Sequence, residues 1–379
     1  MSAQLRPSAF SMLRAVGSCS VIDIFQLLCI QGKRAHYGER FGLPANCFPV
    51  SIPAFPQSPR AERFHRFFQA YQPFTKTHAL RFKMLNFSYA NPTRLVFGRS
   101  AEHEVGRVMT SILGRPGKVL VLFGGGSAHR TGILGAVEDS LQESGFAVIE
   151  MGGVQPNPRM GFVRDTIDWV RDQGIRAVVA VGGGSVIDTA KAVAAGLEYE
   201  GDAWDFFAGR AQVERALPVF AVLTIPAAGS EQSIRAVITH HGTKTGIGSE
   251  HIRPKAAFIN PERFSTLPAI HISAGVCDML SHICERYFSN TAATDFVDGQ
   301  AEAALRTIIE FGPKVLADPS NYDAWCQIGL AGSFAHNGIF GLGREEDWAC
   351  HAIEHEISGW NESIIHGCGL AVVMPAWIC

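Results

Sequence analysis

The sequence is poor in charge and has no strong excess of either sign. Charged residues make up only 18% of 379 positions, and 33 Lys and Arg face 35 Asp and Glu. A balance this close to neutral argues against a nucleic-acid-binding protein with a globally basic surface, so no nucleic-acid partner is expected. The hydrophobic share of 47% excludes a disordered chain. At roughly 100–200 residues per domain, the length predicts two or three domains.

Paired cysteine motifs and long apolar runs are also missing. The nine cysteines are odd in number and form no CxxC pair, so we expect free thiols and a reducing, cytoplasmic location. The longest apolar run near the start, 21–30, is interrupted by Asp23 and Gln26. This run is too short to cross a bilayer and lacks the basic-then-apolar order of a signal peptide. We therefore expect no membrane partner.

Acidic residues are scarce at the start of the chain. Residues 1–83 hold 11 Lys and Arg but only three acids, which leaves 22 basic and 32 acidic residues for 84–379. The leader is open to three interpretations: an organelle transit peptide, a disordered tail, or upstream sequence translated before a true start at Met84, of which we prefer the third. We divide the chain into a basic leader (1–83), an α/β region (84–270) and a helical region (271–379).

Short apolar runs alternate with amphipathic segments in the α/β region. The runs are typical of buried parallel strands and lie at 118–123, 146–150, 176–181 and 218–225. The helical patterns between them lie at 132–144, 163–173 and 186–197. Such alternation predicts a parallel sheet with right-handed crossovers. The fold class expected from this pattern is an α/β domain, followed by the helical region.

Two Gly-Gly-Gly-Ser turns follow predicted strands of this sheet. Gly124–Ser127 and Gly182–Ser185 each lead into a predicted helix. Ligands of parallel sheets bind beyond the carboxyl ends of the strands, where glycine lets a phosphate approach and a helix start offers N–H donors. One such turn could simply be a tight connection, but two in one sheet favour a nucleotide. No GxGxxG or GxxxxGK[ST] occurs, so an ordinary Rossmann fingerprint is unsupported and a P-loop is excluded.

Histidines are concentrated in the helical region. Asp278 and His282 are spaced i, i+4, which puts them on one helix face, and His351 and His355 repeat that spacing before His366. One carboxylate with several imidazoles suits Fe²⁺ or Zn²⁺, although a single helical histidine is usually structural. The spacing does not choose between His351 and His355. The remaining histidines that lack such partners are interpreted as structural: His240, His241, His251, His271 and His336.

Eight stretches of the chain carry a family resemblance: PTRLVFG (92–98), GGGSAHRTG (124–132), GGVQPNP (152–158), AVGGGSVIDTAK (180–191), LTIPAAGSE (223–231), GVCDMLSH (275–282), DWACHAIEHEIS (347–358) and HGCGLAV (366–372). By these stretches, which occur in the family's order, the chain from residue 87 to its end resembles the iron-containing (group III) alcohol dehydrogenases. The branch is that of NADPH-dependent butanol dehydrogenases and broad-range aldehyde reductases. The leader has no counterpart in the family.

This resemblance implies an α/β, Rossmann-like nucleotide-binding domain followed by an all-α metal-binding domain, with the active site in the cleft between them. Hydride would pass between NADP(H) and a primary alcohol or aldehyde, such as butanol or butanal. One divalent metal, Fe²⁺ or Zn²⁺, would be held by Asp278, His282, His351 and His366, and His355 would lie beside the substrate as a proton relay. A homodimer is also implied. The cofactor residues carried over are Gly125, Gly126, Ser127, Asn157, Gly183, Gly184, Ser185, Val186, Asp188, Thr224, Ser230 and Lys244.

The choice of NADP(H) over NAD(H) depends on Ser127. The NADPH-preferring branch has a small polar residue at this position, where NAD-preferring relatives usually have an acid. An acid accepts a hydrogen bond from the ribose 2′-OH but repels a 2′-phosphate. Ser127 lacks that charge and can donate to a phosphate, and His129 and Arg130 follow with basic side chains.

The sequence departs from the family pattern at three places. Ala228 stands where threonine is usual, and the interval from His351 to His366 is one residue longer, so the loop at 360–365 must absorb an insertion. Family members continue through several more helices after the position of Cys379, so C-terminal helices are expected to be missing. Two alternatives stay open: a truncated, inactive homologue that binds metal or nucleotide without turnover, and a relative of glycerol dehydrogenase or dehydroquinate synthase.

Overall fold

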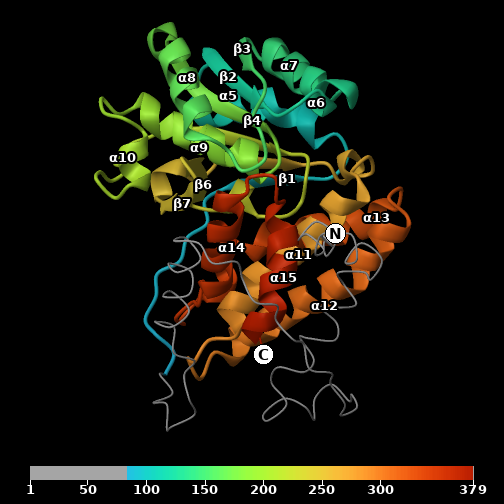
Figure 1. Ribbon diagram of the computed structural model, residues 1–379. Coiled ribbons are helices and arrows are strands. Elements are labelled where there is room, and N and C mark those ends of the chain that lie inside the picture. Colours follow the sequence, from blue (N-terminus) through green and yellow to red (C-terminus); the bar gives the residue numbers. More distant parts are fainter. Residues whose placement is uncertain (1–82, 379) are drawn as a thin grey trace, which may run out of the picture.

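The computed structural model describes residues 83–378. Predictions for residues 1–82 and Cys379 lie outside the described residues. Figure 1 shows a sheet with helices on both faces above a separate group of helices. The six parallel strands have the order β1-β8-β5-β4-β2-β3, which confirms the predicted α/β fold class. They are β1 (Arg94–Phe97), β2 (Lys118–Phe123), β3 (Ala147–Met151), β4 (Ile175–Gly182), β5 (Val219–Leu223) and β8 (Ala256–Ile259).

Side chains of β2 supply both faces of the sheet, which explains why this strand is apolar throughout. Val119 and Val121 belong to a core cluster that is shared with the helices α5 (Val105–Leu113) and α7 (Ile133–Glu143). Leu120 and Leu122 belong to a second cluster, on the side of α8 (Met160–Val170) and α9 (Gly184–Leu197). Because all four side chains are fully buried, the sheet is covered on both faces.

An antiparallel hairpin links the sheet region to the helical region. Its strands are β6 (Arg235–His240) and β7 (Thr243–Gly248). In Figure 1 the hairpin lies between α9 and the red helix α14 (Ala349–Trp360). The sequence patterns did not predict this hairpin or the strands β1 and β8.

The helical region is built around one central helix. α11 (Ala269–Tyr287) is buried almost continuously from Ile272 to Arg286, and it packs against the other four long helices. Gly367 lies so close to α11 that an added Cβ would fall 2.0 Å from the Ala274 carbonyl oxygen. The remaining long helices are α12 (Asp295–Ala317), α13 (Tyr322–Ala335), α14 and α15 (His366–Ile378).

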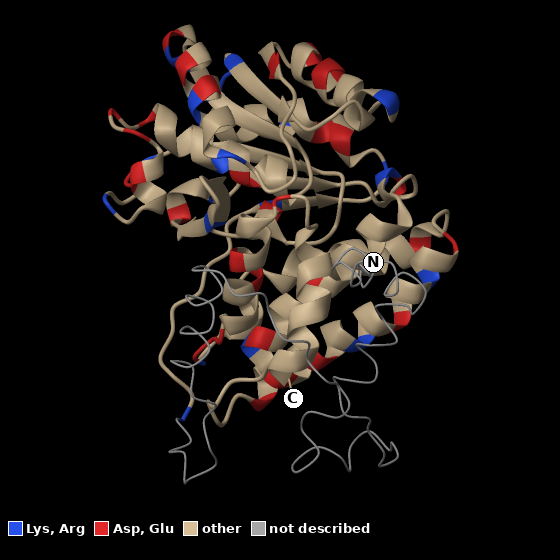
Figure 2. Ribbon diagram, viewed as in Figure 1, with Lys and Arg blue, Asp and Glu red and all other residues tan. Residues whose placement is uncertain are grey.

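Short helical turns connect the main elements. They are α6 (Ser127–Arg130), α10 (Trp204–Phe207) and the 3₁₀ turns Ala101–Glu104, Arg171–Gln173, Ser230–Gln232, Glu250–Ile252, Pro261–Phe264 and Ile339–Gly341. Figure 2 shows acidic and basic positions scattered over both regions. Within residues 83–378, no helix has the length and apolar character needed to cross a bilayer. The five cysteines of this part form no disulfide with one another: Cys277, Cys284, Cys326, Cys350 and Cys368.

Candidate functional site

The strand order has a switch point between β2 and β4. β2 pairs with β3 on one side and β4 on the other, so successive crossovers leave in opposite directions there. The two Gly-rich turns follow these two central strands, and α9 begins at Gly184, directly after β4. A switch point in an open parallel sheet is where ligands bind, and the start of α9 adds backbone N–H donors.

A cavity of about 710 Å³ joins this sheet edge to the helical region. The volume is typical of ligand and cofactor sites. One side is formed by the Gly-rich turns and the loop around Asn157, and the other by residues of α11, α14 and α15. Every predicted cofactor residue except Gly126 lines this cavity, and so do all five residues predicted for metal and proton transfer.

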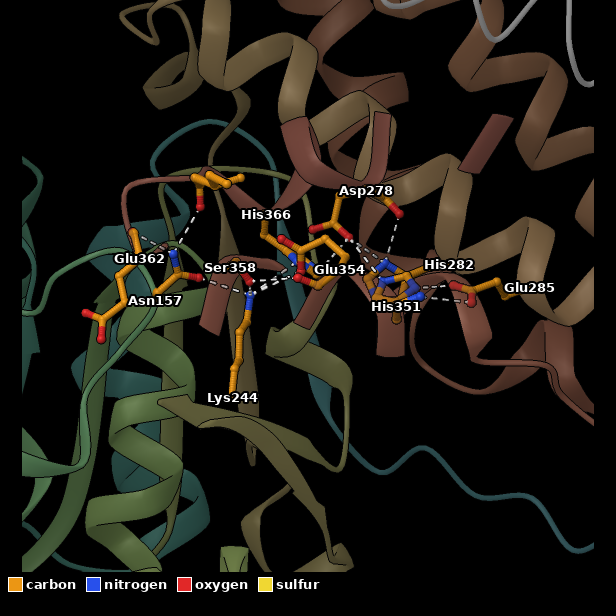
Figure 3. A network of polar contacts seen from close by, with 11 residues as sticks. Asn157, Lys244, Asp278, His282, Glu285, His351, Glu354, Ser358, Glu362 and His366 are labelled. Carbon is orange, nitrogen blue, oxygen red and sulfur yellow. Dashed lines mark hydrogen bonds and ion pairs between the residues drawn. The ribbon is translucent and has the colours of Figure 1, made fainter. Parts of the chain in front are cut away.

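The predicted metal ligands converge on one carboxylate oxygen of Asp278 (Figure 3). His282 follows Asp278 by one turn of α11, and its Nδ1 lies 3.0 Å from Asp278 Oδ1. The Nε2 atoms of His351, on α14, and His366, at the start of α15, lie 3.6 and 3.9 Å from the same oxygen. Three helices that are far apart in sequence therefore bring these four side chains together.

Two polar atoms of this cluster are buried without a hydrogen-bond partner. They are Asp278 Oδ1 and His351 Nε2, which make no hydrogen bond within residues 83–378. His282 Nδ1 lies near Asp278 Oδ1 but donates its proton to the Asp278 backbone oxygen, at 2.9 Å. Leaving a buried atom unsatisfied costs about 1–3 kcal/mol. A divalent cation between Asp278 Oδ1 and His351 Nε2 would satisfy both. One carboxylate and three imidazoles are also a suitable donor set for a transition metal, so the residues present fit the metal that the resemblance implies.

Two buried glutamates contact the far side of the histidine rings. Glu285 contacts Nδ1 of His351 and accepts a 3.1 Å hydrogen bond from its backbone N–H, whereas Glu354 contacts Nδ1 of His366. Both glutamates are 0% exposed. A carboxylate on one ring nitrogen fixes the ring and leaves the other nitrogen for a metal. The sequence patterns missed Glu285 and Glu354, although Glu285 lies two turns after Asp278 on α11.

The charges in this cluster shift one another's pKa values. Burial alone would raise the pKa of Asp278, but His282, His351 and His366 hold it well below its usual range. Burial alone would lower the pKa of His351, but Glu285 and Asp278 raise it to about 9. A proton on His351 therefore has to leave before Nε2 can bind a metal.

His355 lies one helical turn after His351 and lines the cavity. Its ring centroid is 5.4 Å from that of His366. Burial, followed by the charges of Lys244 and His366, holds the pKa of His355 well below its ordinary value. The pKa of an unperturbed histidine is near 6.5. The difference arises because folding buries the ring and brings it close to Lys244.

His336, interpreted from the sequence as structural, also lines the cavity. Its ring centroid is 4.3 Å from that of His282, and its Nδ1 lies 2.9 Å from the Arg286 guanidinium, which must be the donor. No local spacing could indicate this position, because His336 meets His282 only through the packing of α13 against α11.

Two of the predicted cofactor residues use their polar groups inside the protein. Ser230 donates a 2.6 Å hydrogen bond to Asp188, which also accepts the N–H of Val237 at 2.9 Å. Lys191 Nζ donates to Ser230 Oγ and to three carbonyl oxygens, at 2.7–2.9 Å. Burial lowers the pKa of Lys191 to about 8. We refer to Asp188, Lys191 and Ser230 as the Lys191 cluster. It fixes hairpin strand β6 beside α9.

Lys244, another predicted cofactor residue, extends from β7 toward the helices (Figure 3). Its Nζ lies 3.0 Å from Asn157 Oδ1, 2.9 Å from Ser358 Oγ and 3.3 Å from both Glu354 Oε2 and His366 Nδ1. Burial lowers the pKa of this amine, although Glu354 opposes the shift.

In this structure, a sheet edge with the features of a dinucleotide-binding site faces a cluster of carboxylate and imidazole groups. This arrangement is typical of a two-domain dehydrogenase. Two family models match most of the chain. The model for iron-containing alcohol dehydrogenase matches residues 92–261, and the C-terminal model of the Fe-containing alcohol dehydrogenase family matches residues 272–379.

Several curated proteins are similar over three quarters of their length. The probable NADH-dependent butanol dehydrogenase 1 of Bacillus subtilis is 41% identical over 297 residues, which cover 78% of this chain and 76% of the relative. The NADPH-dependent aldehyde reductase YqhD of Escherichia coli is 37% identical over 298 residues, with 77% and 75% covered.

A comparison with solved structures points to the same family. The crystal structure of NADH-dependent butanol dehydrogenase A from Thermotoga maritima matches with a TM-score of 0.75 at 41% identity, covering 78% of this chain and 74% of that one. The chain belongs to the iron-containing alcohol dehydrogenase family and is an alcohol/aldehyde oxidoreductase.

Proposed function

We propose that this protein transfers hydride between NADP(H) and a primary alcohol or aldehyde of the butanol/butanal type, with the help of one Fe²⁺ or Zn²⁺ ion. One observation carries the proposal: a single cavity connects the Gly-rich turns of the sheet with the unpartnered atoms of Asp278 and His351. When bound, the metal supplies Lewis acidity toward the substrate oxygen, and the nicotinamide donates or accepts the hydride.

The chain's own residues would hold these groups in place. Asp278, His282, His351 and His366 provide the donors, and the Asp278 carboxylate offsets part of the cation's charge. Glu285 keeps the His351 ring oriented through its Nδ1. The Gly-rich turns and the start of α9 would bind the phosphates of the dinucleotide. A homodimer remains a prediction from the resemblance.

His355 is the residue proposed to move the proton between the substrate oxygen and water. It lines the cavity next to the proposed ligands, and a positioned general base contributes about 10²–10⁴-fold to a rate. His282→Ala and His366→Ala should lose both metal and turnover, whereas His355→Ala should retain metal and lose rate. Metal analysis and steady-state kinetics on the three purified variants test this. Loss of metal from His355→Ala would overturn the assignment.

The preference for NADP(H) is supported by the charges near Ser127. Ser127 lines the cavity without a carboxylate, and Arg130 Nη1 lies 3.0 Å from where a Cβ on Gly126 would stand, so a guanidinium is close to this turn. Some similar proteins are named as NADH-dependent, so the cofactor preference of this protein has to be measured. We expect kcat/KM to be at least about tenfold higher with NADPH, and Ser127→Asp to reverse the order through repulsion of the 2′-phosphate. A clear NADH preference of the wild-type protein would refute this part.

A further inference from the structure

Lys244 is a direct connection between the two sides of the cavity. Its Nζ contacts Asn157, on the loop between β3 and α8, and also Glu354 and His366, on the helices (Figure 3). The side chain of Lys244 is only 5% exposed and that of Glu354 is fully buried. Few waters can therefore compete for these contacts, which makes the connection short and well defined.

Asn157 provides a second connection to His366, the proposed metal ligand that Lys244 contacts. Its Nδ2 donates to the carbonyl oxygens of Glu362, at 2.9 Å, and Ile364, at 3.0 Å. These residues belong to the segment that ends at His366. The backbone of Asn157 has φ +53°, a conformation that asparagine tolerates better than most residues. The side-chain amide thus holds Lys244 with its oxygen and the 361–365 loop with its nitrogen.

His366 differs in this respect from the other proposed ligands. Asp278, His282 and His351 have side chains only 5–8% exposed, and they lie within the helices α11 and α14. The His366 side chain is 24% exposed. Its ring is held by Glu354, whose carboxylate also accepts from Lys244, and Asn157 holds the loop before it. The position of this one ligand therefore depends on the side of the cavity where the nucleotide is expected.

We propose that Lys244 and Asn157 couple nucleotide binding to metal binding by positioning His366. This inference rests on the function proposed above. A nucleotide against the Asn157 loop restricts Asn157 and Lys244, and with them the 361–365 loop and the His366 ring. The metal restricts the same groups from the other side. Whichever ligand binds first orders the shared segment, so the second binds more tightly, and the two effects are equal in size.

The experiment measures Zn²⁺ affinity by competition with a chromophoric chelator, without nucleotide and with saturating NADPH or NADH in separate series. For wild-type protein we expect about tenfold tighter Zn²⁺ binding with the preferred nucleotide, and the same factor for nucleotide binding when Zn²⁺ is present. Lys244→Met should bind Zn²⁺ about 10–100-fold more weakly than wild-type protein. The ratio of its Zn²⁺ affinities with and without nucleotide, the coupling ratio, should be near one. Lys314→Met, which removes an exposed ion pair on α12, is the matched control and should behave like wild type.

Asn157→Asp tests the second connection and decides the matter if Lys244→Met does not fold. Aspartate tolerates the same backbone conformation and keeps an acceptor for Lys244, but it lacks the two N–H donors to the loop. We expect a reduced coupling ratio. In metal-free wild-type protein, the nucleotide alone should slow amide hydrogen exchange across 361–366, and this protection should be lost in both variants.

The outcomes separate the inference from the proposed function. A wild-type protein that binds both ligands with a ratio of one overturns the coupling and leaves the function standing. If the coupling ratio of Lys244→Met equals that of wild-type protein, the role of Lys244 is overturned. If the coupling ratio of Asn157→Asp equals that of wild-type protein, the role of Asn157 is overturned. A wild-type protein that binds neither Zn²⁺ nor a nicotinamide nucleotide overturns both proposals.

Discussion

Two clusters of buried charge, one in each region of the molecule, are organised in opposite ways. Lys191, in the α/β region, is fully buried, and the three N–H groups of its ammonium face four acceptor oxygens at 2.7–2.9 Å. Asp278, in the helical region, is 3% exposed, and its Oδ1 accepts no hydrogen bond from the part of the chain that the structure describes. A charge whose hydrogen bonds are complete stabilises the fold, whereas an incomplete one marks a place where a ligand belongs.

The largest effect is expected at Lys191. Lys191→Met leaves three buried carbonyl oxygens without their donor and removes the positive charge that offsets the Asp188 carboxylate, so the free energy of unfolding should fall by about 3–5 kcal/mol. Urea unfolding of the variant and of wild-type protein measures the loss, with Lys314→Met as the matched surface control. A loss below about 1 kcal/mol would contradict the structural role of the Lys191 cluster.

Asp278 is equally buried, but its main role should be in metal binding. Asp278→Asn keeps the size of the side chain but removes a charge that the neighbouring histidines stabilise, so the metal-free free energy of unfolding should fall by less than in Lys191→Met. Stabilisation by saturating metal, about 4 kcal/mol at a thousandfold excess over Kd, should vanish together with turnover. Thermal unfolding with and without Zn²⁺ tests both statements. An unchanged metal response would show that Asp278 is not a ligand.

The smallest effect concerns an unfavourable carboxylate pair far from both clusters. Burial and the neighbouring Glu150 raise the pKa of Glu138, on α7, to about 7. The folded protein therefore binds this proton more strongly than the unfolded chain does. The resulting stability is fully present below pH 4.5 and is lost as the pH rises through 7.

Glu138→Gln should remove the loss of stability that Glu138 causes as the pH rises through 7. Because Glu138 is partly exposed and solvent screens the pair, we expect Tm to rise by only about 1–2 °C at pH 8, with no gain at pH 4.5. Thermal scans at the two pH values measure the difference, and Glu143→Gln on the same helix is the control. An equal gain at both pH values would point to helix propensity instead.

The parts of the fold that were predictable are those determined by local sequence. The boundaries of β2 match the predicted strand, and those of β4 agree within one residue at each end, because both strands are apolar on both faces. β1 and β8 are four residues long, too short for a periodic signal. The hairpin β6–β7 has mixed polar and apolar residues, and its position depends on contacts with α9 and α14.

The candidate site shows the same division. The i, i+4 pair Asp278 and His282 could be read from the sequence because both lie on one helix. Glu285 contacts a histidine that is 66 residues away, so its role becomes visible only when α11 and α14 pack together. The role of Lys244 at the Asn157 loop likewise depends on a contact across 87 positions, which no spacing rule can reveal.

The strand order also determines when the sheet can be completed during synthesis. β1, near the start of the described chain, pairs only with β8, and residue 94 lies opposite residue 256. A contact of such high sequence separation forms slowly. As the chain leaves the ribosome, the edge of β8 that will receive β1 cannot exist until residues beyond 256 have emerged. The β2–β4 core, whose partners are closer in sequence, can assemble earlier and serve as the template on which the other strands dock.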